Sequence, residues 1–228
     1  MRRQLQPEIL DHLAPDDPRA IQARRDLRKV NAFMGHAGLI TRALRAQRPM
    51  PRRIVELGAG DGSLLLRVAT RLGRAQAGVR AVLVDRAPTI SARTSADFRA
   101  LGWDVVADET DVFDWLMRPA AEQADMMLAN LFLHHFDEGE LSTLFAAIAR
   151  QTNRLIACEP RRSRTALAGA SLLFLLGCND VTRHDANISV RGGFRDAELS
   201  QLWPNEQGWR LEEARAGLFS HFLLASRT

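Results

Sequence analysis

The sequence of 228 residues contains no tyrosine, one lysine and two cysteines. Cys158 and Cys178 stand far apart and outside any C-x-x-C spacing, so neither a zinc site nor a disulfide framework is indicated, and a cytoplasmic location is expected. The longest apolar run, residues 166–178, is about half the length of a membrane span. The N-terminus has two arginines without the apolar stretch of a secretory signal. We therefore expect a soluble protein with no stable membrane insertion.

Positive charge is plentiful but scattered. Lys and Arg number 31 against 27 Asp and Glu, a net charge of +4, and the densest basic group is Arg161, Arg162 and Arg164. A nucleic-acid-binding surface needs basic residues gathered on one face, so the scatter argues against a polynucleotide partner. The hydrophobic fraction of 46% and the charged fraction of 25% are those of a globular protein, and the length suits one domain.

A glycine-rich turn stands between a short apolar run and a stretch with helical spacing. The run IVEL at 54–57 predicts a buried strand, and residues 63–72 predict a helix. Gly58, Gly60 and Gly62 allow a sharp turn and a close approach of a ligand to the backbone. The dinucleotide fingerprint G-x-G-x-x-G would put its third glycine at position 63, which is Ser63. The spacing therefore indicates a nucleotide site of another kind.

Strands and helices alternate after the turn, which predicts a parallel sheet with helices on both faces. Further strands are expected at 81–85, 104–107, 125–130 and 154–160, with a helix at 138–150. A helix at 198–203 and a hairpin of 209–214 with 218–225 complete the chain. Asp85 ends the second strand, 23 residues after Gly62, where a carboxylate can accept hydrogen bonds from both hydroxyls of a ribose. The alternative for Asp85 is the N-cap of the next helix.

The pattern E-x-G-x-G-x-G from Glu56 to Gly62 resembles motif I of the class I S-adenosylmethionine-dependent methyltransferases. The stretch from Asp125 to Phe136 is similar to motif IV of the same family. The resemblance covers roughly residues 50–160 by motif and implies a Rossmann-like α/β sheet of seven strands in the order 3-2-1-4-5-7-6. It implies S-adenosyl-L-methionine as cofactor, with an acid after strand three for the adenine, here Asp111 rather than Asp108. The implied cofactor-binding residues are Glu56, Gly58, Gly60, Asp61, Gly62, Asp85, Arg86, Asp111, Val112, Asn130 and Leu131.

Two segments lie outside these motifs. Residues 1–49 predict one or two helices broken near Gly35 and Gly38, and the resemblance implies a lid over the cofactor cleft from which Asn31 and His36 could face the site. Residues 161–195 are expected to be a substrate-recognition insertion within a methyltransferase domain spanning 50–228. Its helix at 165–178 is apolar nearly all round, so it either enters the core or forms a wall of an apolar substrate pocket. The candidate substrate-binding residues are Phe174 and Arg191.

Three histidines are candidates for a general base. His134 and His135 follow the fourth strand, where the resemblance implies the methyl-transfer site, and His184 stands beside Asp185 in a polar run, unless Arg183 takes that carboxylate. An imidazole with a pKa near 6.5 can take the proton of a phenol or enol. The pair has no further acid or histidine at helical spacing, so no metal site is expected.

The resemblance leaves several functions open. We expect methylation of a small, largely apolar acceptor (phenolic, polyketide-like or quinone-like) with oxygen preferred, because histidines are available and Asn130 is not followed by an N-P-P-Y-type amine signature. Carbon methylation and an inactive cofactor-binding partner subunit remain alternatives. An NAD-dependent oxidoreductase is disfavoured by the glycine spacing and by the absence of the tyrosine in Y-x-x-x-K. A macromolecular substrate is disfavoured by the scattered charge, and the oligomeric state is not indicated.

Overall fold

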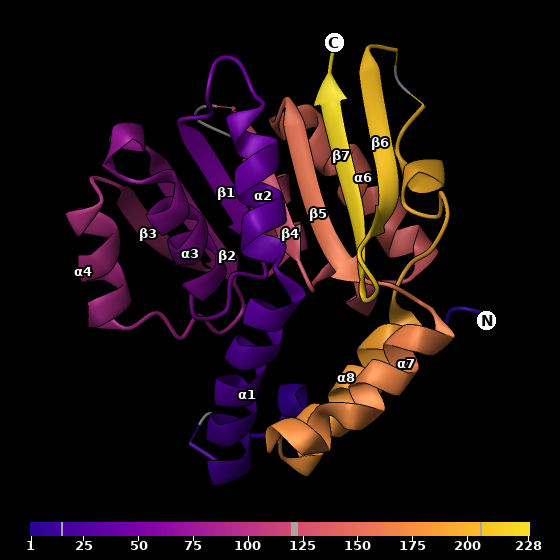
Figure 1. Ribbon diagram of the computed structural model, residues 1–228. Coiled ribbons are helices and arrows are strands. Elements are labelled where there is room, and N and C mark those ends of the chain that lie inside the picture. The colour runs from indigo at the N-terminus through magenta and orange to yellow at the C-terminus, as the bar shows by residue number, and fades with distance from the viewer. Residues whose placement is uncertain (15, 120–122, 206) are drawn as a thin grey trace.

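The computed structural model in Figure 1 describes residues 1–14, 16–119, 123–205 and 207–228. A sheet with the strand order β3-β2-β1-β4-β5-β7-β6 forms its centre, as the resemblance implied. Strands β1 to β5 run parallel, and β7 is antiparallel to both of its neighbours. The strands are β1 (Arg53–Leu57), β2 (Arg80–Asp85), β3 (Asp104–Glu109), β4 (Met126–Asn130), β5 (Arg154–Pro160), β6 (Trp209–Ala216) and β7 (Ser220–Arg227).

Helices cover both faces of the sheet because β1, β4 and β5 are apolar on both sides. On one face, α2 (His36–Arg45), α3 (Ser63–Leu72) and α4 (Ala92–Ala100) contribute to a buried cluster. On the other, α5 (Val112–Met117) and α6 (Glu138–Gln151) contribute to a second one. The two clusters hold the sheet between them and so fix the positions of the carboxyl ends of its parallel strands.

A third group of helices lies beyond the carboxyl ends of the parallel strands, below the sheet in Figure 1. It consists of α1 (Pro18–Met34), α7 (Arg164–Ser171) and α8 (Asp180–Gly192). The buried carboxylate of Asp26 on α1 accepts the backbone N–H of Asn179 at 2.9 Å and pairs with Lys29 at 3.2 Å. Gly35, in the left-handed region with φ 71°, separates α1 from α2 near the predicted break. The N-terminal helix is thus tied to the 161–195 segment.

The predicted helix at 165–178 is wrong in its extent. Helix α7 ends at Ser171, and a 3-10 turn, η4 (Leu172–Leu176), follows it. Helix α7 packs through small residues, since a Cβ on Gly169 would lie 2.6 Å from the Phe219 ring. Four of the five η4 side chains are more than half exposed: Leu172, Phe174, Leu175 and Leu176. The all-round apolar pattern therefore reflects surface residues as well as packed ones.

The polar run at 179–185 forms the N-cap and the first turns of α8 (Asp180–Gly192). Asn179 caps this helix by accepting the N–H of Thr182, and Val181, Asp185 and Ile188 lie on its buried face. A buried acid, Asp185, occupies one position of this face, which is therefore not purely apolar. The predicted helix at 198–203 is only a 3-10 turn, η5 (Ser200–Leu202). Among the described residues, no helix is long and apolar enough to cross a membrane.

Candidate active site

The glycine turn joins β1 to α3 and has three residues in the left-handed region, Gly58, Gly60 and Gly62. A Cβ on Gly58 would lie 2.2 Å from the Phe132 ring, so only glycine allows the turn to pack against the end of β4. A Cβ on Gly60 would meet none of the described atoms within 4 Å. The turn therefore leaves open space above Gly60.

Asp85 at the end of β2 holds this turn in place. One carboxylate oxygen accepts the N–H of Gly60 at 2.8 Å, and the other accepts that of Ala87 at 2.9 Å. Helix α4 is capped by Ser91, so the N-cap alternative for Asp85 is wrong. Arg86, the next residue, also lines the cleft. A carboxylate can accept about four hydrogen bonds, so Asp85 keeps acceptor capacity for a ligand.

Glu56, on the strand that leads into the turn, has a buried carboxyl oxygen without a hydrogen-bond partner among the described residues. It is 2% exposed, and its Oε2 has no hydrogen-bond partner among the described residues. Burial, with the nearby charges of Asp61 and Asp85, raises the pKa of Glu56 to about 8. The carboxylate of Asp61 accepts a hydrogen bond from the backbone N–H of Ser63 and forms an ion pair with Arg28 of α1 at 3.2 Å. A cationic group entering the cleft would satisfy Glu56.

The end of β4 is the second wall of the cleft. Asn130 and Leu131 line it, and Leu131 has φ 51°, a rare conformation for a branched residue and one that often marks functional sites. Asn130 Oδ1 accepts from His36 Nδ1 at 2.6 Å, while His36 Nε2 lies 2.7 Å from Ser220 Oγ. Burial lowers the pKa of His36, which is therefore neutral and orients Asn130 from behind. Asn31, by contrast, lines the cleft itself.

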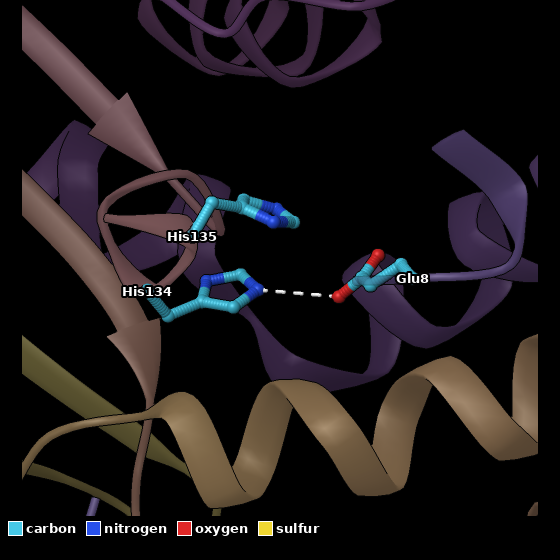
Figure 2. Close-up of side chains that lie close together, drawn as sticks. All are labelled: Glu8, His134 and His135. Carbon is cyan, nitrogen blue, oxygen red and sulfur yellow. Dashed lines mark hydrogen bonds and ion pairs between the residues drawn. The ribbon is translucent and has the colours of Figure 1, made fainter. Parts of the chain in front are cut away.

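The histidine pair follows in η3 (Leu133–His135), and Figure 2 shows both rings directed toward Glu8 of the N-terminal segment. His134 is 4% exposed; its Nδ1 donates to Glu159 Oε2 at 2.8 Å, and its Nε2 lies 3.4 Å from Glu8 Oε1. Burial alone would lower the pKa of His134, but the two carboxylates outweigh it and raise the pKa to about 9. The ordinary value near 6.5 expected for this histidine is therefore wrong.

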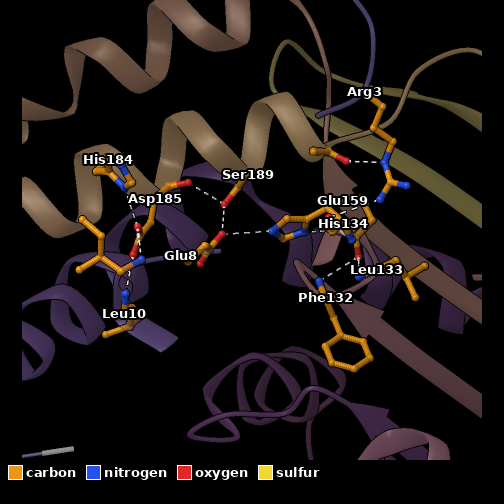
Figure 3. A network of polar contacts seen from close by, with 12 residues as sticks. Arg3, Glu8, Leu10, Phe132, Leu133, His134, Glu159, His184, Asp185 and Ser189 are labelled. Atoms are coloured by element: carbon orange, nitrogen blue, oxygen red, sulfur yellow. Dashed lines mark hydrogen bonds and ion pairs between the residues drawn. The ribbon is translucent and has the colours of Figure 1, made fainter. Parts of the chain in front are cut away.

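The cluster extends over several segments, as Figure 3 shows. Glu159 at the end of β5 also accepts the backbone N–H groups of Phe132 and Leu133, at 3.0 and 2.9 Å. Ser189 of α8 donates to Glu8. The ring of His135 lies 4.2 Å from that of His134, and burial together with the charge of His134 lowers its pKa. Sequence reasoning missed Glu8, because only the fold brings it to the pair.

His184 lies apart from this cluster. Its side chain on α8 is half exposed, and its Nδ1 lies 3.1 Å from Asp185 Oδ1. Asp185 is occupied by the backbone N–H groups of Ile9 and Leu10, not by Arg183, and so anchors the N-terminal segment on α8. The predicted pairing of His184 with Asp185 therefore exists, but away from His134 and His135.

Besides His184, the predicted residues that do not line the cleft are Gly62, Asp111, Val112, His135, Phe174 and Arg191. Asp111 caps α5 by accepting the N–H of Phe113, and Val112 lies in the core. Phe174 is 52% exposed on η4, and Arg191 is exposed near the end of α8. Their predicted positions in the site followed from order along the chain, whereas the actual direction of each side chain depends on how its element packs.

Gly58, Gly60 and Asp61 of the glycine turn line one cavity of about 780 Å³ together with Glu8, His134 and Ser189 of the cluster. Its floor is the carboxyl end of the sheet, and its walls are α1, α7, α8 and the N-terminal segment. The wall opposite the glycine turn is mostly apolar. It consists of Leu10, Leu13, Leu27, Val30, Phe33, Met34, Ala166, Ala170, Leu173, Val190 and Phe219.

Three solved structures with a similar fold are described here, and each of them is a methyltransferase. The plantazolicin methyltransferase BpumL, in complex with SAH, is 12% identical, with 93% of this chain and 92% of that chain covered and a TM-score of 0.66. The mitomycin 7-O-methyltransferase MmcR is 20% identical, with 96% and 60% covered and a TM-score of 0.62. The magnesium protoporphyrin IX methyltransferase of Synechocystis PCC 6803, with bound SAH, is 16% identical, with 90% and 86% covered and a TM-score of 0.56.

Comparisons of the sequence gave one family match and no curated relative. No curated protein matches the chain. The sequence model of a family described as "Methyltransferase domain" matches residues 54–154, which run from β1 to the start of β5. These residues carry the glycine turn, Asp85 and the end of β4. Residues 54–154 thus match a methyltransferase domain family, and the chain has the fold of the class I, S-adenosylmethionine-dependent methyltransferases.

Proposed function

We propose that the protein transfers a methyl group from S-adenosylmethionine to an oxygen atom of a small, largely apolar molecule. The observation that carries this proposal is the cavity that combines the glycine turn with an apolar wall and with Glu8 and His134, next to which His135 lies. Methyl transfer needs the acceptor in line with the donor and water excluded, and a deep cavity meets both needs.

The residues around the glycine turn fit the cofactor. The unsatisfied Glu56 Oε2 suits the ammonium group of the methionine part, and the space above Gly60 admits a ligand against the backbone. Asp85 has acceptor capacity left for ribose hydroxyls. The bound sulfonium would supply the electrophilic methyl group. Asp111 remains our proposal for the adenine end, although it lies outside the cavity lining.

The apolar wall supports an acceptor with alkyl or aromatic parts. Its residues all lie outside the family match: in the N-terminal 49 residues, in residues 161–195 and, for Phe219, just before β7. We therefore keep the interpretation of residues 1–49 as a lid and of 161–195 as a recognition segment. The name of MmcR, an O-methyltransferase, agrees with an oxygen acceptor.

The histidine pair stands where the acceptor oxygen would be activated. His134 lines the cavity, and Glu159 and Glu8 fix its ring from both sides. His184 lies outside the lining and away from the cluster, whereas the ring of His135 contacts that of the lining residue His134. We therefore keep His134 and His135 as the catalytic candidates among the three histidines. Glu8 joins them as a third member.

The test is incubation of the purified protein with methyl-labelled S-adenosylmethionine and a panel of phenols, enols and quinones that differ in alkyl length. We expect labelled products from apolar acceptors, with the methyl group on oxygen by NMR. A carbon-bound methyl group would instead establish the C-methyltransferase alternative. Binding of S-adenosylhomocysteine without turnover of any acceptor would support an inactive partner subunit.

A further inference from the structure

We propose that Glu8, His134 and His135 form a binding site for a divalent transition-metal ion such as Zn²⁺. One possible ligand atom from each of the three residues lies within 4.8 Å of the others. Figure 2 shows the two rings and the carboxylate converging from η3 and from the N-terminal segment. Two imidazoles and one carboxylate are a donor set that Zn²⁺ and its neighbours in the first transition row bind readily.

The closest contact of the cluster already has the dimension of a coordination shell. Zinc lies about 2.0–2.1 Å from nitrogen and oxygen ligands, so two ligand atoms of a tetrahedral site stand roughly 3.3–3.4 Å apart. The distance from His134 Nε2 to Glu8 Oε1 is 3.4 Å. His135, exposed at the end of η3, offers a ring nitrogen within 4.8 Å of the ligand atoms of Glu8 and His134.

Neighbouring residues orient the ligands as they do in metalloproteins. Glu159 accepts the Nδ1–H of His134 at 2.8 Å, so a metal ion that displaces the proton on Nε2 would bind that nitrogen on the side of Glu8. Such a carboxylate behind a histidine fixes the tautomer and raises the basicity of the ligating nitrogen. Ser189 donates to Glu8 in the same way. An ion pair between Glu8 and His134 alone would leave the convergence of His135 unexplained.

The proposed site would keep an open position toward the acceptor. Glu8 and His134 both line the cavity, so a fourth ligand would come from the apolar side. A metal ion with three protein ligands lowers the pKa of a bound hydroxyl, whose proton passes to water. The metal would thus ionise the acceptor oxygen before methyl transfer. This role rests on the proposed function, whereas metal binding itself does not.

Titration of the full-length, chelator-treated protein with Co²⁺ tests the site through the visible d–d absorption of the bound ion. We expect saturable absorption in the wild type. Glu8→Gln and His135→Gln should weaken Co²⁺ binding by roughly 100-fold or more, and Glu159→Gln, which removes an orienting partner, by roughly 10–100-fold. His184→Gln is the matched control and should bind Co²⁺ as the wild type does. Calorimetry with S-adenosylhomocysteine verifies that each variant is folded.

Two results would overturn the site. One is the absence of Co²⁺ absorption in the folded wild type; the other is unchanged binding in Glu8→Gln and His135→Gln. Either would reduce the cluster to an ion pair with a neighbouring histidine. Methyl transfer at the full rate in metal-free protein would remove the activating role. Metal binding without methyl transfer to any acceptor would instead count against the proposed function and leave the metal site standing.

Discussion

The two halves of the cavity are built in different ways. The cofactor half comes from the ends of adjacent strands and is held by hydrogen bonds to the backbone, such as that of 2.8 Å from the N–H of Gly60 to the carboxylate of Asp85. The acceptor half brings together Glu8, His134 and Ser189, which come from three distant parts of the chain. The first half depends on one local turn, whereas the second depends on the packing of α1 and α8 over the sheet.

The largest expected effect is in the acceptor half. His134→Gln keeps a polar side chain of similar size but removes the imidazole between Glu159 and Glu8. We expect kcat to fall by about 10²–10⁴, with the affinity for S-adenosylhomocysteine unchanged. His184→Gln is the control and should turn over normally. Equal loss of turnover in both variants would mean that the pair has no special place in the reaction.

A substitution of Gly60 tests ligand binding in the cofactor half. A valine there would be forced into φ 55° and would fill the open space above the turn. Gly73→Val is a matched control, because Gly73 has φ 73° and open space but lies at the end of α3, away from the cavity lining. We expect both variants to lose stability, but only Gly60→Val to lose S-adenosylhomocysteine binding, by about 100-fold or more in calorimetry, which is at least about 2.7 kcal/mol.

The contrast explains what the sequence could predict. The glycine turn and the end of β4 are contiguous motifs, so their placement followed from order along the chain and from the strand pattern. The seven-strand order was implied by the resemblance to the methyltransferase family, and the structure confirms it. Asp85 could be located because strand ends meet at one edge of such a sheet.

The acceptor half could not be predicted in the same way. Glu8 acquires its place only when the N-terminal segment binds α8 through Asp185. Phe174 was chosen for its apolar surroundings in sequence, but the chain tightens into a 3-10 turn and exposes it, while Leu173 turns inward. Which of two neighbouring apolar side chains in such a turn faces the cavity depends on tertiary packing and leaves no periodic signal in the sequence.

Asp85→Ala tests the ribose role against a purely structural one. Loss of a charged hydrogen bond should weaken S-adenosylhomocysteine binding by about 1.5–3 kcal/mol, roughly 10–100-fold. Asp108→Ala is the control: Asp108, near the end of β3, pairs with Arg118 at 2.8 Å and does not line the cavity. Undiminished binding in Asp85→Ala would reduce the acid to a brace for Gly60 and Ala87.

Leu173 and Phe174 provide a comparison within one turn. Leu173 lines the cavity, whereas the neighbouring Phe174 is 52% exposed at the surface. We expect Leu173→Asp to raise the acceptor KM about tenfold, because it places a charge against an apolar ligand. Phe174→Asp should leave KM near the wild-type value. The reverse ranking in steady-state kinetics would show that the acceptor binds on the outer side of η4.

The smallest expected effect concerns Glu56, whose buried carboxyl has a pKa of about 8 against 4.5 in its ordinary state. Between these values the folded protein binds more protons than the unfolded chain, so its contribution to stability is complete below pH 4.5 and is lost as the pH rises through 8. The slope approaches a loss on the order of 1 kcal/mol per pH unit. Glu56→Gln should lack this slope and be more stable than the wild type at pH 8.

Urea unfolding of both proteins at intervals from pH 5 to 8 measures the difference. Bound S-adenosylhomocysteine should remove it, because its ammonium group would stabilise the ionised carboxylate in the folded state. Affinity for this ligand should therefore rise with pH toward 8 in the wild type and stay flat in Glu56→Gln. Parallel stability profiles would mean that Glu56 is ionised without a cation. A group other than the neighbours that contact Glu56 would then have to stabilise its negative charge.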